Sequence, residues 1–212
     1  VITLAPDAAK YVWILHGALA LDMGLKEALE QAGMTVNEGF EDTGFAGGIT
    51  GGPATYEDML SCGTIICDNA DTSMLTSFQR FALSDYFAAG GRLVLLGGTT
   101  TRGITWSQSP LRRFAPLAPL HLQPCDLSAA TGPRKDWANL LPKGVYYQTW
   151  KAGVGEPLLE INGDVLATRI PVGHGDIMAL GLSGLGAVEP ADYFSSEKWQ
   201  TLLQQLTEKS GR

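Results

Sequence analysis

Short apolar runs that end in polar or glycine residues recur along the first hundred residues of the chain. Residues 11–15 read Tyr-Val-Trp-Ile-Leu, residues 63–68 are rich in β-branched side chains, and residues 92–98 read Arg-Leu-Val-Leu-Leu-Gly-Gly. Runs of this length and composition are typical of strands buried in a parallel sheet. Helical patterns separate them, so the strand–helix–strand order predicts βαβ units with right-handed crossovers.

Two of the connecting segments carry signals for where a helix begins and ends. In the first, apolar residues recur at helical spacing and Gly33 is a suitable stop, after which residues 34–36 open another strand. In the second, Thr76 or Ser73 is a suitable N-cap, and the glycine pair at residues 90–91 ends the helix.

Two long stretches lack a regular pattern. Residues 39–55 are rich in glycine and show no periodicity, which predicts a long surface loop. Residues 107–150 are punctuated by prolines, and the pattern there is too weak to predict individual elements.

The C-terminal part changes character. It predicts a β-hairpin, a further strand and a closing amphipathic helix, at residues 157–170, 177–181 and 197–209. The turn of the hairpin is Asn162-Gly163, the strongest short hairpin signal. With 212 residues and no internal repeat, the chain is expected to form a single domain over residues 1–212.

Charge and hydropathy exclude two classes of partner. The net charge is −7 and the pI about 4.9, and no cationic patch is visible, so we expect no nucleic-acid partner. No apolar stretch reaches the roughly 18 residues that a spanning helix needs, so we expect no membrane insertion.

The cysteines and the glycine motifs bound the chemistry further. Three cysteines without a C-x-x-C pair argue against a disulfide framework and a structural zinc site, and we expect no metal. Free thiols fit a reducing compartment, so a cytoplasmic location is expected. The chain begins at Val1, which leaves a removed signal peptide open. Neither G-x-G-x-x-G nor a P-loop occurs, so no cofactor is expected.

A ligand site is expected in the crevice outside the carboxyl ends of the parallel strands, where open α/β sheets bind their ligands. Three predicted strands end in this region with polar or glycine residues. The candidate ligand-binding residues are His16, Asp68, Asn69, Gly97, Gly98, Thr99, Thr100, Arg102 and Trp106.

Each of these candidates has a functional and a structural interpretation. Gly97-Gly98 lets backbone amides approach a ligand closely, or it only permits a tight strand exit. Arg102 offers a fork of donors to a carboxylate or phosphate, or is solvated. Trp106 walls the crevice, or covers the core. His16 is a base or donor, or caps a turn.

The run at residues 81–98, followed by Gly103, Ser109-Pro110 and residues 114–117, resembles proteins of the class I glutamine amidotransferase-like superfamily. Residues 157–159, residues 173–179 and the Trp199 helix are similar to that group's closing hairpin and last helix, so the resemblance covers residues 10–206. It implies an α/β, flavodoxin-like three-layer sandwich with a central, mostly parallel sheet and a C-terminal β-hairpin.

The chain departs from the pattern of that family at the catalytic elbow. The family's Gly-x-Cys-x-Gly motif falls on Gly97 to Thr101, which puts Thr99 at the cysteine position. No His-x-Glu motif lies near the C-terminus, and His174 sits between two glycines in a predicted turn. A threonine hydroxyl is a weak nucleophile without a base in reach, so the glutaminase activity that the resemblance implies is not expected.

Three hypotheses follow. The first is a non-catalytic amidotransferase-like domain that binds a small molecule or a protein partner at the carboxyl ends of the strands. The second is a hydrolase or amidohydrolase with a non-standard site, for which Cys67, His16 and Thr99 are the candidate catalytic residues. The third is an interaction module in which copies of the chain form a homo-oligomer. We favour the first, because the scaffold is intact and the usual nucleophile is missing.

Overall fold

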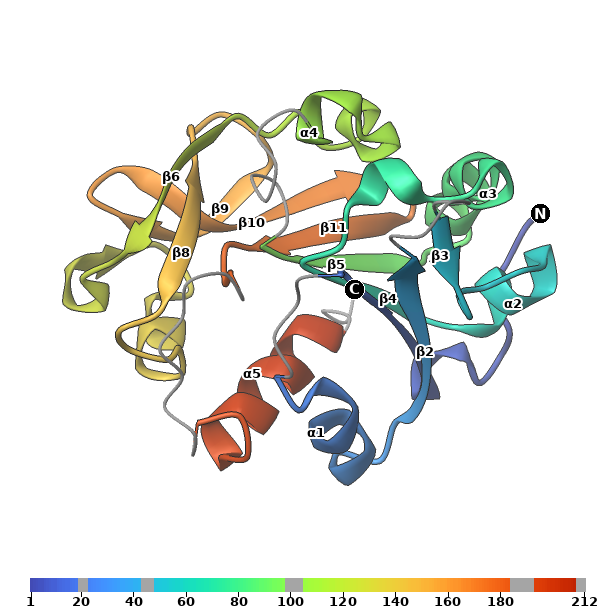
Figure 1. Cartoon of the computed structure of the whole chain (residues 1–212), viewed down its shortest axis with the longest axis horizontal. Helices are drawn as coiled ribbons and strands as arrows, with labels where there is room; N and C mark the ends of the chain where they lie inside the picture. Colours follow the sequence, from blue (N-terminus) through green and yellow to red (C-terminus); the bar gives the residue numbers. More distant parts are fainter. Residues whose placement is uncertain (19–22, 43–47, 98–104, 184–192, 209–212) are drawn as a thin grey trace.

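A large mixed sheet with helices on both faces organises the computed structural model (Figure 1). The structure describes residues 1–212 except 19–22, 43–47, 98–104, 184–192 and 209–212. The strands are β1 Tyr11–His16, β2 Thr35–Asp42, β3 Gly48–Thr50, β4 Thr64–Asp68, β5 Arg92–Leu96, β6 Pro119–Pro124, β7 Ala130–Thr131, β8 Tyr146–Trp150, β9 Glu156–Ile161, β10 Asp164–Val172 and β11 Gly175–Leu180.

Five α-helices and several 3-10 turns connect the strands within the described ranges. The α-helices are α1 Leu25–Gln31, α2 Tyr56–Ser61, α3 Ser77–Ala88, α4 Thr105–Gln108 and α5 Glu197–Thr207. The 3-10 turns are η1 Ala8–Lys10, η2 Thr72–Met74, η3 Pro110–Arg113, η4 Leu127–Ala129 and η5 Lys135–Asn139. The predicted α/β class is therefore confirmed.

The strand order divides the sheet into a parallel and an antiparallel half. The order is β3-β2-β1-β4-β5-β11-β10-β8-β6, with β9 paired to β10 and β7 to β9. The five strands from β2 to β11 run parallel to one another. Beyond β11 the pairings of β10, β8 and β6 are antiparallel. The parallel half is where several strand ends meet at one edge.

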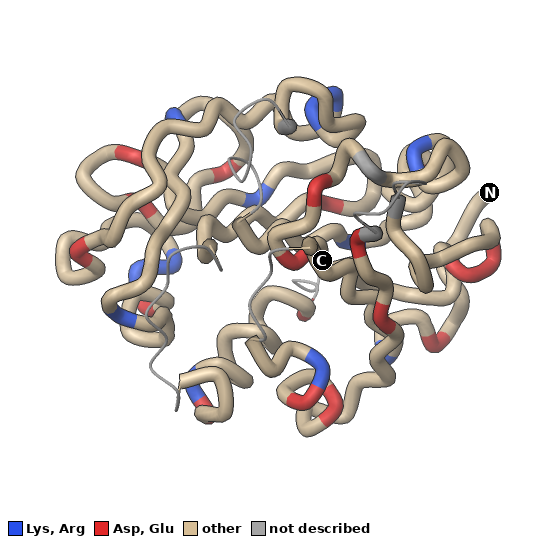
Figure 2. The backbone as a smooth tube through the Cα atoms, viewed as in Figure 1, with Lys and Arg blue, Asp and Glu red and all other residues tan. Residues whose placement is uncertain are grey.

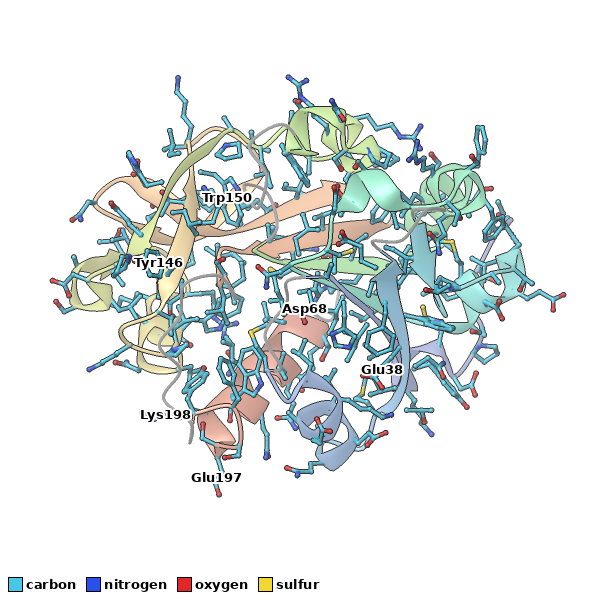
Figure 3. All side chains as sticks on the ribbon, viewed as in Figure 1. Glu38, Asp68, Tyr146, Trp150, Glu197 and Lys198 are labelled. Atoms are coloured by element: carbon cyan, nitrogen blue, oxygen red, sulfur yellow. The ribbon has the colours of Figure 1, made fainter. Side chains whose placement is uncertain are left out.

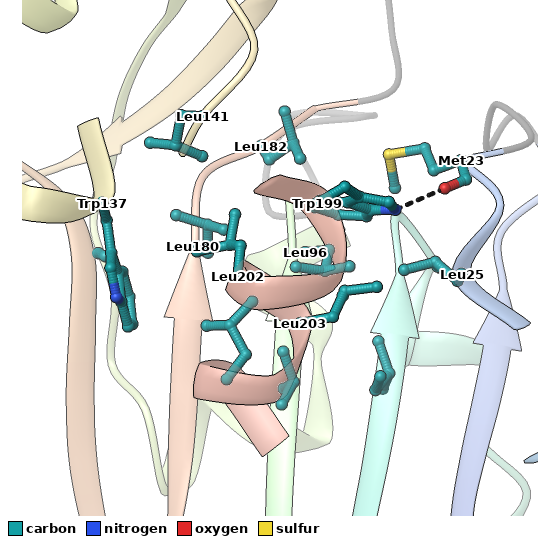
Figure 4. Packing of buried hydrophobic residues seen from close by; sticks show 14 of the residues in the cluster. Met23, Leu25, Leu96, Trp137, Leu141, Leu180, Leu182, Trp199, Leu202 and Leu203 are labelled. Carbon is teal, nitrogen blue, oxygen red and sulfur yellow. Dashed lines mark hydrogen bonds between the residues drawn. The ribbon is translucent and has the colours of Figure 1, made fainter. Parts of the chain in front are cut away.

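Alternate side chains of each strand enter two separate apolar cores, one on each face. On β4, Ile66 belongs to the core that α1 and α5 cover, whereas Ile65 and Cys67 belong to the core that α3 covers. The indole Nε1 of Trp199 on α5 donates to the backbone oxygen of Met23 at 2.7 Å, which fixes the start of α1 against α5 (Figure 4). Helices thus lie on both faces of the sheet.

The predicted helix and hairpin signals act where they were expected. Thr76, rather than Ser73, caps α3, and its side chain forms a capping box with Gln79. Asn162 and Gly163 have φ values of 53° and 89°, and the two-residue turn joins β9 to β10 as an antiparallel hairpin. These signals are local, so they do not depend on the rest of the fold.

The loop predicted at residues 39–55 is wrong. β2 continues through this glycine-rich stretch to Asp42, paired with β1 and then with β3. Position 39 of this strand needs a glycine because the backbone of Gly52 approaches it closely. A Cβ on Gly39 would lie 2.8 Å from the nitrogen of Gly52. Glycines that permit a close backbone approach look like loop glycines in the sequence.

The irregular stretch at residues 107–150 also holds regular structure. It contains β6, β7 and β8 together with three of the 3-10 turns. β6 pairs with β8 across a register shift between Pro119 and Leu122, which explains why its proline-bounded sequence shows no clean alternation.

A buried arginine ties the C-terminal helix to the sheet. Arg92 at the start of β5 is 1% exposed, and it forms two hydrogen bonds of 2.7 Å with the carboxylate of Asp176 on β11. The same guanidinium donates to the backbone oxygens of Leu206 and Glu208 at the end of α5. Arg169 also donates to Asp176, at 2.8 Å. The fork of Arg92 therefore joins β5, β11 and the α5 C-terminus.

We expect Arg92→Ala to lower the free energy of unfolding by about 3 kcal/mol, because it leaves a buried carboxylate short of its main cation. Denaturation by urea measures this. Glu156→Gln is the matched control, since the Glu156–Arg169 pair at 3.7 Å is exposed and should contribute less than about 1 kcal/mol. A loss in Arg92→Ala as small as that of the control would contradict the prediction.

Candidate functional site at the carboxyl edge of the sheet

The parallel strands remain joined by backbone hydrogen bonds just past their carboxyl ends. The amide of Gly17 donates to the oxygen of Asp68, that of Asn69 to Leu96, and that of Gly97 to Leu180, each at 2.9 Å. The residues that follow β1, β4 and β5 are therefore held at fixed positions beside one another.

Two glycines make this close approach possible around Asn69. Asn69 has a φ of 48°, in the left-handed region that asparagine tolerates better than most residues. A Cβ on Gly17 would lie 2.2 Å from the backbone oxygen of Asn69, and one on Gly97 would lie 2.4 Å from its side-chain oxygen. Gly97 also has a positive φ of 57°. Only glycine fits at both positions without displacing Asn69.

His16, the last residue of β1, lies between two carboxylates from the strands on either side. Its Nδ1 lies 3.0 Å from Oδ2 of Asp68 on β4, and its Nε2 lies 3.1 Å from Oε1 of Glu38 on β2. Figure 3 labels both carboxylates, Glu38 on β2 and Asp68 at the end of β4. The alternation of parallel strands places all three side chains on the α1 face of the sheet.

The chain of contacts continues at both ends. Oδ1 of Asp68 accepts a hydrogen bond of 3.1 Å from the Nδ2 of Asn69, and Oε2 of Glu38 lies 2.9 Å from Nζ of Lys26 on α1. We call His16, Glu38, Asp68, Asn69 and Lys26 the carboxyl-edge cluster. Its exposure rises outward: the side chain of Asp68 is fully buried, whereas those of His16 and Glu38 are 20% and 24% exposed and that of Lys26 40%.

The geometry requires a doubly protonated imidazole. A carboxylate has only acceptors, and neutral histidine carries a single N–H, so it can donate to one of the two carboxylates but not to both. His16 satisfies both neighbours only as the imidazolium. The cluster then consists of two cations and two anions in alternation, from Lys26 to Glu38 to His16 to Asp68.

The electrostatics of the cluster agree with this protonation state. Burial acts to lower the pKa of His16, but the hydrogen bonds and negative charges of Asp68 and Glu38 outweigh it, and the pKa lies above its usual 6.5. Burial acts to raise the pKa of Glu38, but the hydrogen bonds and positive charges of Lys26 and His16 outweigh it, and that pKa is lowered. The carboxylate of Glu38 thus favours the charged forms of His16 and Lys26, and these two cations favour the charged form of Glu38.

An aromatic ring and a third carboxylate border the cluster. Phe40, two residues beyond Glu38 on β2, stacks on the His16 ring with centroids 5.0 Å apart and is itself 54% exposed. Oε2 of Glu41 accepts from the backbone amides of Ala18 and Asp71, at 3.2 and 3.1 Å. Acidic residues recur along this part of β2 in Figure 2. The edge therefore presents hydrogen-bond acceptors beside an exposed apolar ring.

Four of the predicted ligand-binding residues come together here: His16, Asp68, Asn69 and Gly97. Gly98, Thr99, Thr100 and Arg102 lie outside the described residues. Trp106 on α4 is 5% exposed and packs in the α3-side core, on the face opposite His16. Its indole nitrogen has no hydrogen-bond partner in the part of the chain that the structure describes. The structural interpretation of Trp106 therefore fits better than that of a crevice wall.

Cys67 is poorly placed to act as a nucleophile. Its side chain is 2% exposed in the α3-side core, away from the His16 face of the sheet. Burial, with a further contribution from the negative charge of Asp68, raises the pKa of the Cys67 thiol to about 12. Reactive cysteines have lowered pKa values and accessible sulfurs. Packing accounts for this residue.

The sequence analysis did not single out Glu38, Lys26 or Phe40. Glu38 and Phe40 lie on β2, a strand that the sequence interpretation opened at residues 34–36 and replaced with a loop from residue 39. Glu38 interrupts the apolar positions Val36 and Phe40 on one face of the strand, so the sequence carries no clean alternation that would have extended it.

Two cavities of about 400 Å³ are lined by described residues, and neither includes a member of the cluster. One lies between α1 and α5, beside Gly24, Ala28 and Phe194. The other lies at the amino end of the sheet, beside Gly63 and Thr64. Among the described residues no His, Cys, Asp and Glu side chains group as a metal ion would need, and no described helix is long and apolar enough to cross a membrane.

Comparisons with known proteins identify similar folds. No model of a known protein family matches the chain, and no curated protein matches it. The solved structure of cytoplasmic protein STM1381 from Salmonella typhimurium LT2 aligns over 93% of this chain and 100% of its own, with a TM-score of 0.67 and 14% identity. Cytoplasmic protein STM3548 from Salmonella typhimurium aligns over 92% and 98%, with a TM-score of 0.61 and 14% identity.

These findings correct the family assignment. A ThuA-like protein from Bacteroides uniformis ATCC 8492 also aligns, over 97% of this chain and 92% of its own, with a TM-score of 0.48 and 14% identity. Neither Salmonella protein is named a glutamine amidotransferase, and no family model supports that family. The assignment to the class I glutamine amidotransferase-like superfamily is wrong. Glycine pairs around an apolar strand are a packing signature that different families share.

The crowding at Gly97 has a measurable consequence. We expect Gly97→Ala to lower the free energy of unfolding by at least about 2 kcal/mol, because a left-handed residue costs about 1 kcal/mol and a forced contact adds a similar amount. Gly33→Ala is the matched control: Gly33 also has a positive φ, of 84°, but nothing lies within 4 Å of its added Cβ. Equal losses in urea denaturation would show that Asn69 does not crowd Gly97.

The protonation of His16 gives a pH dependence with a definite sign. Because its pKa in the folded state lies above the value of 6.5, its contribution to stability is fully present below pH 6.5 and is lost as the pH rises through the folded pKa. We expect the stability advantage of the wild type over His16→Gln to be large at pH 6 and to shrink by pH 8.5. Urea midpoints of both proteins at several pH values measure it, and a constant advantage would contradict the prediction.

Proposed function

We propose that this protein binds a small molecule at the carboxyl-edge cluster, through groups that donate hydrogen bonds. The observation that carries the proposal is the bridged His16: partly exposed charges are held by contacts from four different elements at the edge where α/β sheets bind ligands. A structural ion pair needs two partners, whereas this arrangement keeps an ordered series of charges at the surface. Such pre-positioned polar groups are characteristic of binding sites.

The charge balance favours ligands that donate hydrogen bonds over anionic ones. Three carboxylates (Glu38, Glu41 and Asp68) lie in or beside the cluster, against the two cations His16 and Lys26. The excess of negative charge repels an anion and attracts ammonium or hydroxyl groups. The exposed ring of Phe40 adds an apolar surface for the carbon skeleton of such a molecule. Hydroxyl- or ammonium-rich compounds are therefore the proposed class.

Two narrower features accompany this proposal. The parallel strand order β2-β1-β4-β5-β11 supports the flavodoxin-like description of the fold, for which ligand binding at the strand ends is the rule. The names of the two neighbouring Salmonella proteins support a cytoplasmic location.

The alternative of a hydrolase with a non-standard site is less well supported. A general base must be unprotonated to act, and the raised pKa of His16 extends the protonated form of its ring to higher pH. Both ring nitrogens of His16 are already paired with carboxylates rather than with a described hydroxyl or thiol. Binding therefore fits the geometry better than nucleophilic catalysis.

A thermal-shift screen tests the proposal. The panel contains polyols and amino alcohols, with dicarboxylates as the opposite class, and we expect stabilisation only from the first two groups. A compound present at about 100 times its Kd adds about 2.7 kcal/mol to the stability of the folded state.

Two matched variants locate the binding. His174→Gln should respond like the wild type, because His174 is exposed in the β10–β11 turn at the other end of the sheet, whereas His16→Gln should lose the response. A panel without a stabilising compound, or a response that persists in His16→Gln, would overturn the proposal.

A further inference from the structure

We propose that His16 is a proton-controlled latch on this site: with both ring nitrogens protonated it ties Glu38 to Asp68, and loss of the Nε2 proton releases Glu38 alone. The proposal concerns the regulation of the proposed binding site and rests on that function for its biological meaning. The latch itself rests on the contacts of His16 and is testable without a ligand.

The first step of the argument is the number of donors. The bridge from Asp68 through His16 to Glu38 uses both ring nitrogens, at 3.0 and 3.1 Å, and both acceptors are carboxylate oxygens. When the imidazolium loses a proton, one of the two contacts must lose its hydrogen bond, because two acceptors without a hydrogen repel one another. The cluster cannot keep its geometry unchanged.

The second step is which contact is lost. Asp68 is fully buried, and among the described residues its Oδ2 is paired with His16 while its Oδ1 accepts from the neutral amide of Asn69. Losing His16 would therefore leave Oδ2 of a buried carboxylate without a described hydrogen bond. Glu38 is 24% exposed and keeps its contact with Lys26. Releasing Glu38 costs less, so the remaining proton stays on Nδ1. Deprotonation of His16 therefore breaks its contact with Glu38 on β2 and leaves its contact with the buried Asp68 intact.

The third step concerns the part of β2 that responds when the contact between His16 and Glu38 is lost. Glu38 and Phe40 lie on the same face of β2, and Phe40 is paired in register with His16 and stacked on its ring. β2 has only the short strand β3 outside it. The released Glu38 carboxylate and the unprotonated Nε2 of His16 then form a pair of acceptors with no hydrogen between them. A hydroxyl or ammonium group of a ligand can supply that hydrogen, so protonation and ligand binding compete at one point.

The charged groups around His16 set the pH at which its ring loses the second proton and the latch opens. Asp68 from β4 and Glu38 from β2 face the ring directly, and Lys26 from α1 faces it through Glu38. Glu27 and Glu30 act on Lys26 from the same helix. Removing the negative charge of Glu38 should lower the titration midpoint of His16. Removing the positive charge of Lys26 should raise it.

Ring-nitrogen NMR of the full-length ¹⁵N-labelled chain from pH 5 to 9 tests the latch. The chain has three histidines, so His16→Gln identifies the signals of His16, and His121 and His174 are internal references. We expect both His16 nitrogens to be protonated at low pH and only Nε2 to lose its proton. The backbone amides of Glu38 and Phe40 should shift at the same midpoint, whereas that of Asn69 should not.

Two charge variants test the electrostatic control of the latch. Glu38→Gln should lower the midpoint of His16 and Lys26→Gln should raise it. The loss of the Nε2 proton before the Nδ1 proton, together with the shifts of the Glu38 and Phe40 amides, separates the latch from a merely structural histidine. Loss of the Nδ1 proton first, silent Glu38 and Phe40 amides, or shifts of the same sign in both variants would overturn the latch. Because no ligand is added, a failed compound screen leaves this result standing, and a failed titration leaves the screen standing.

Discussion

The carboxylate of Asp68 carries a negative charge into a fully buried position, and the arrangement of the strand ends follows from the need to compensate it. His16 supplies the cation, which requires β1 and β4 to end at the same level. Glu38 and Lys26 complete the series outward to solvent, so β2 and α1 are held in place by the same charges. A single buried charge thus couples three consecutive elements, β1, α1 and β2, to β4.

The tight backbone packing behind the cluster serves the same requirement. Asn69 donates to Asp68 with its backbone in a left-handed conformation, and the space that it occupies is the space that a Cβ on Gly17 or Gly97 would fill. The glycines here are consequences of the position of Asn69 rather than sources of flexibility. At the amino end of β5, Arg92 and Asp176 form a second pair of buried charges that compensate each other, and Arg92 anchors α5. Both charge networks lie in the parallel half of the sheet.

The similarity to the two Salmonella proteins extends over almost the whole of each chain, so the fold is shared end to end. At 14% identity that similarity describes architecture, and architecture does not determine function. The argument for ligand binding therefore rests on the chemistry of His16 and its neighbours. The same distinction explains the wrong family assignment, which was drawn from residues that pack the sheet.

The sequence by itself determined the features that depend on local physics. The buried strands β1, β4 and β5, the Asn162-Gly163 turn and the closing helix are each specified within a few residues and were predicted, and Thr76 was one of two predicted caps for α3. The edge of the sheet that carries His16, Asp68, Asn69 and Gly97 was also predicted, because parallel strands bring their carboxyl ends together.

Only the tertiary structure decided which side chains contact His16 and which core each strand residue enters. Glu38 and Lys26 join His16 because β2 pairs with β1 in one register and α1 packs over both, and neither fact is encoded in a short segment. The glycine-rich residues of β2 resemble a loop until the backbone of Gly52 is placed against Gly39. Cys67 resembles a nucleophile at a strand end until the alternation of β4 turns it into the opposite core. Long-range pairing sets which face each residue takes, and a sequence pattern specifies that pairing only weakly.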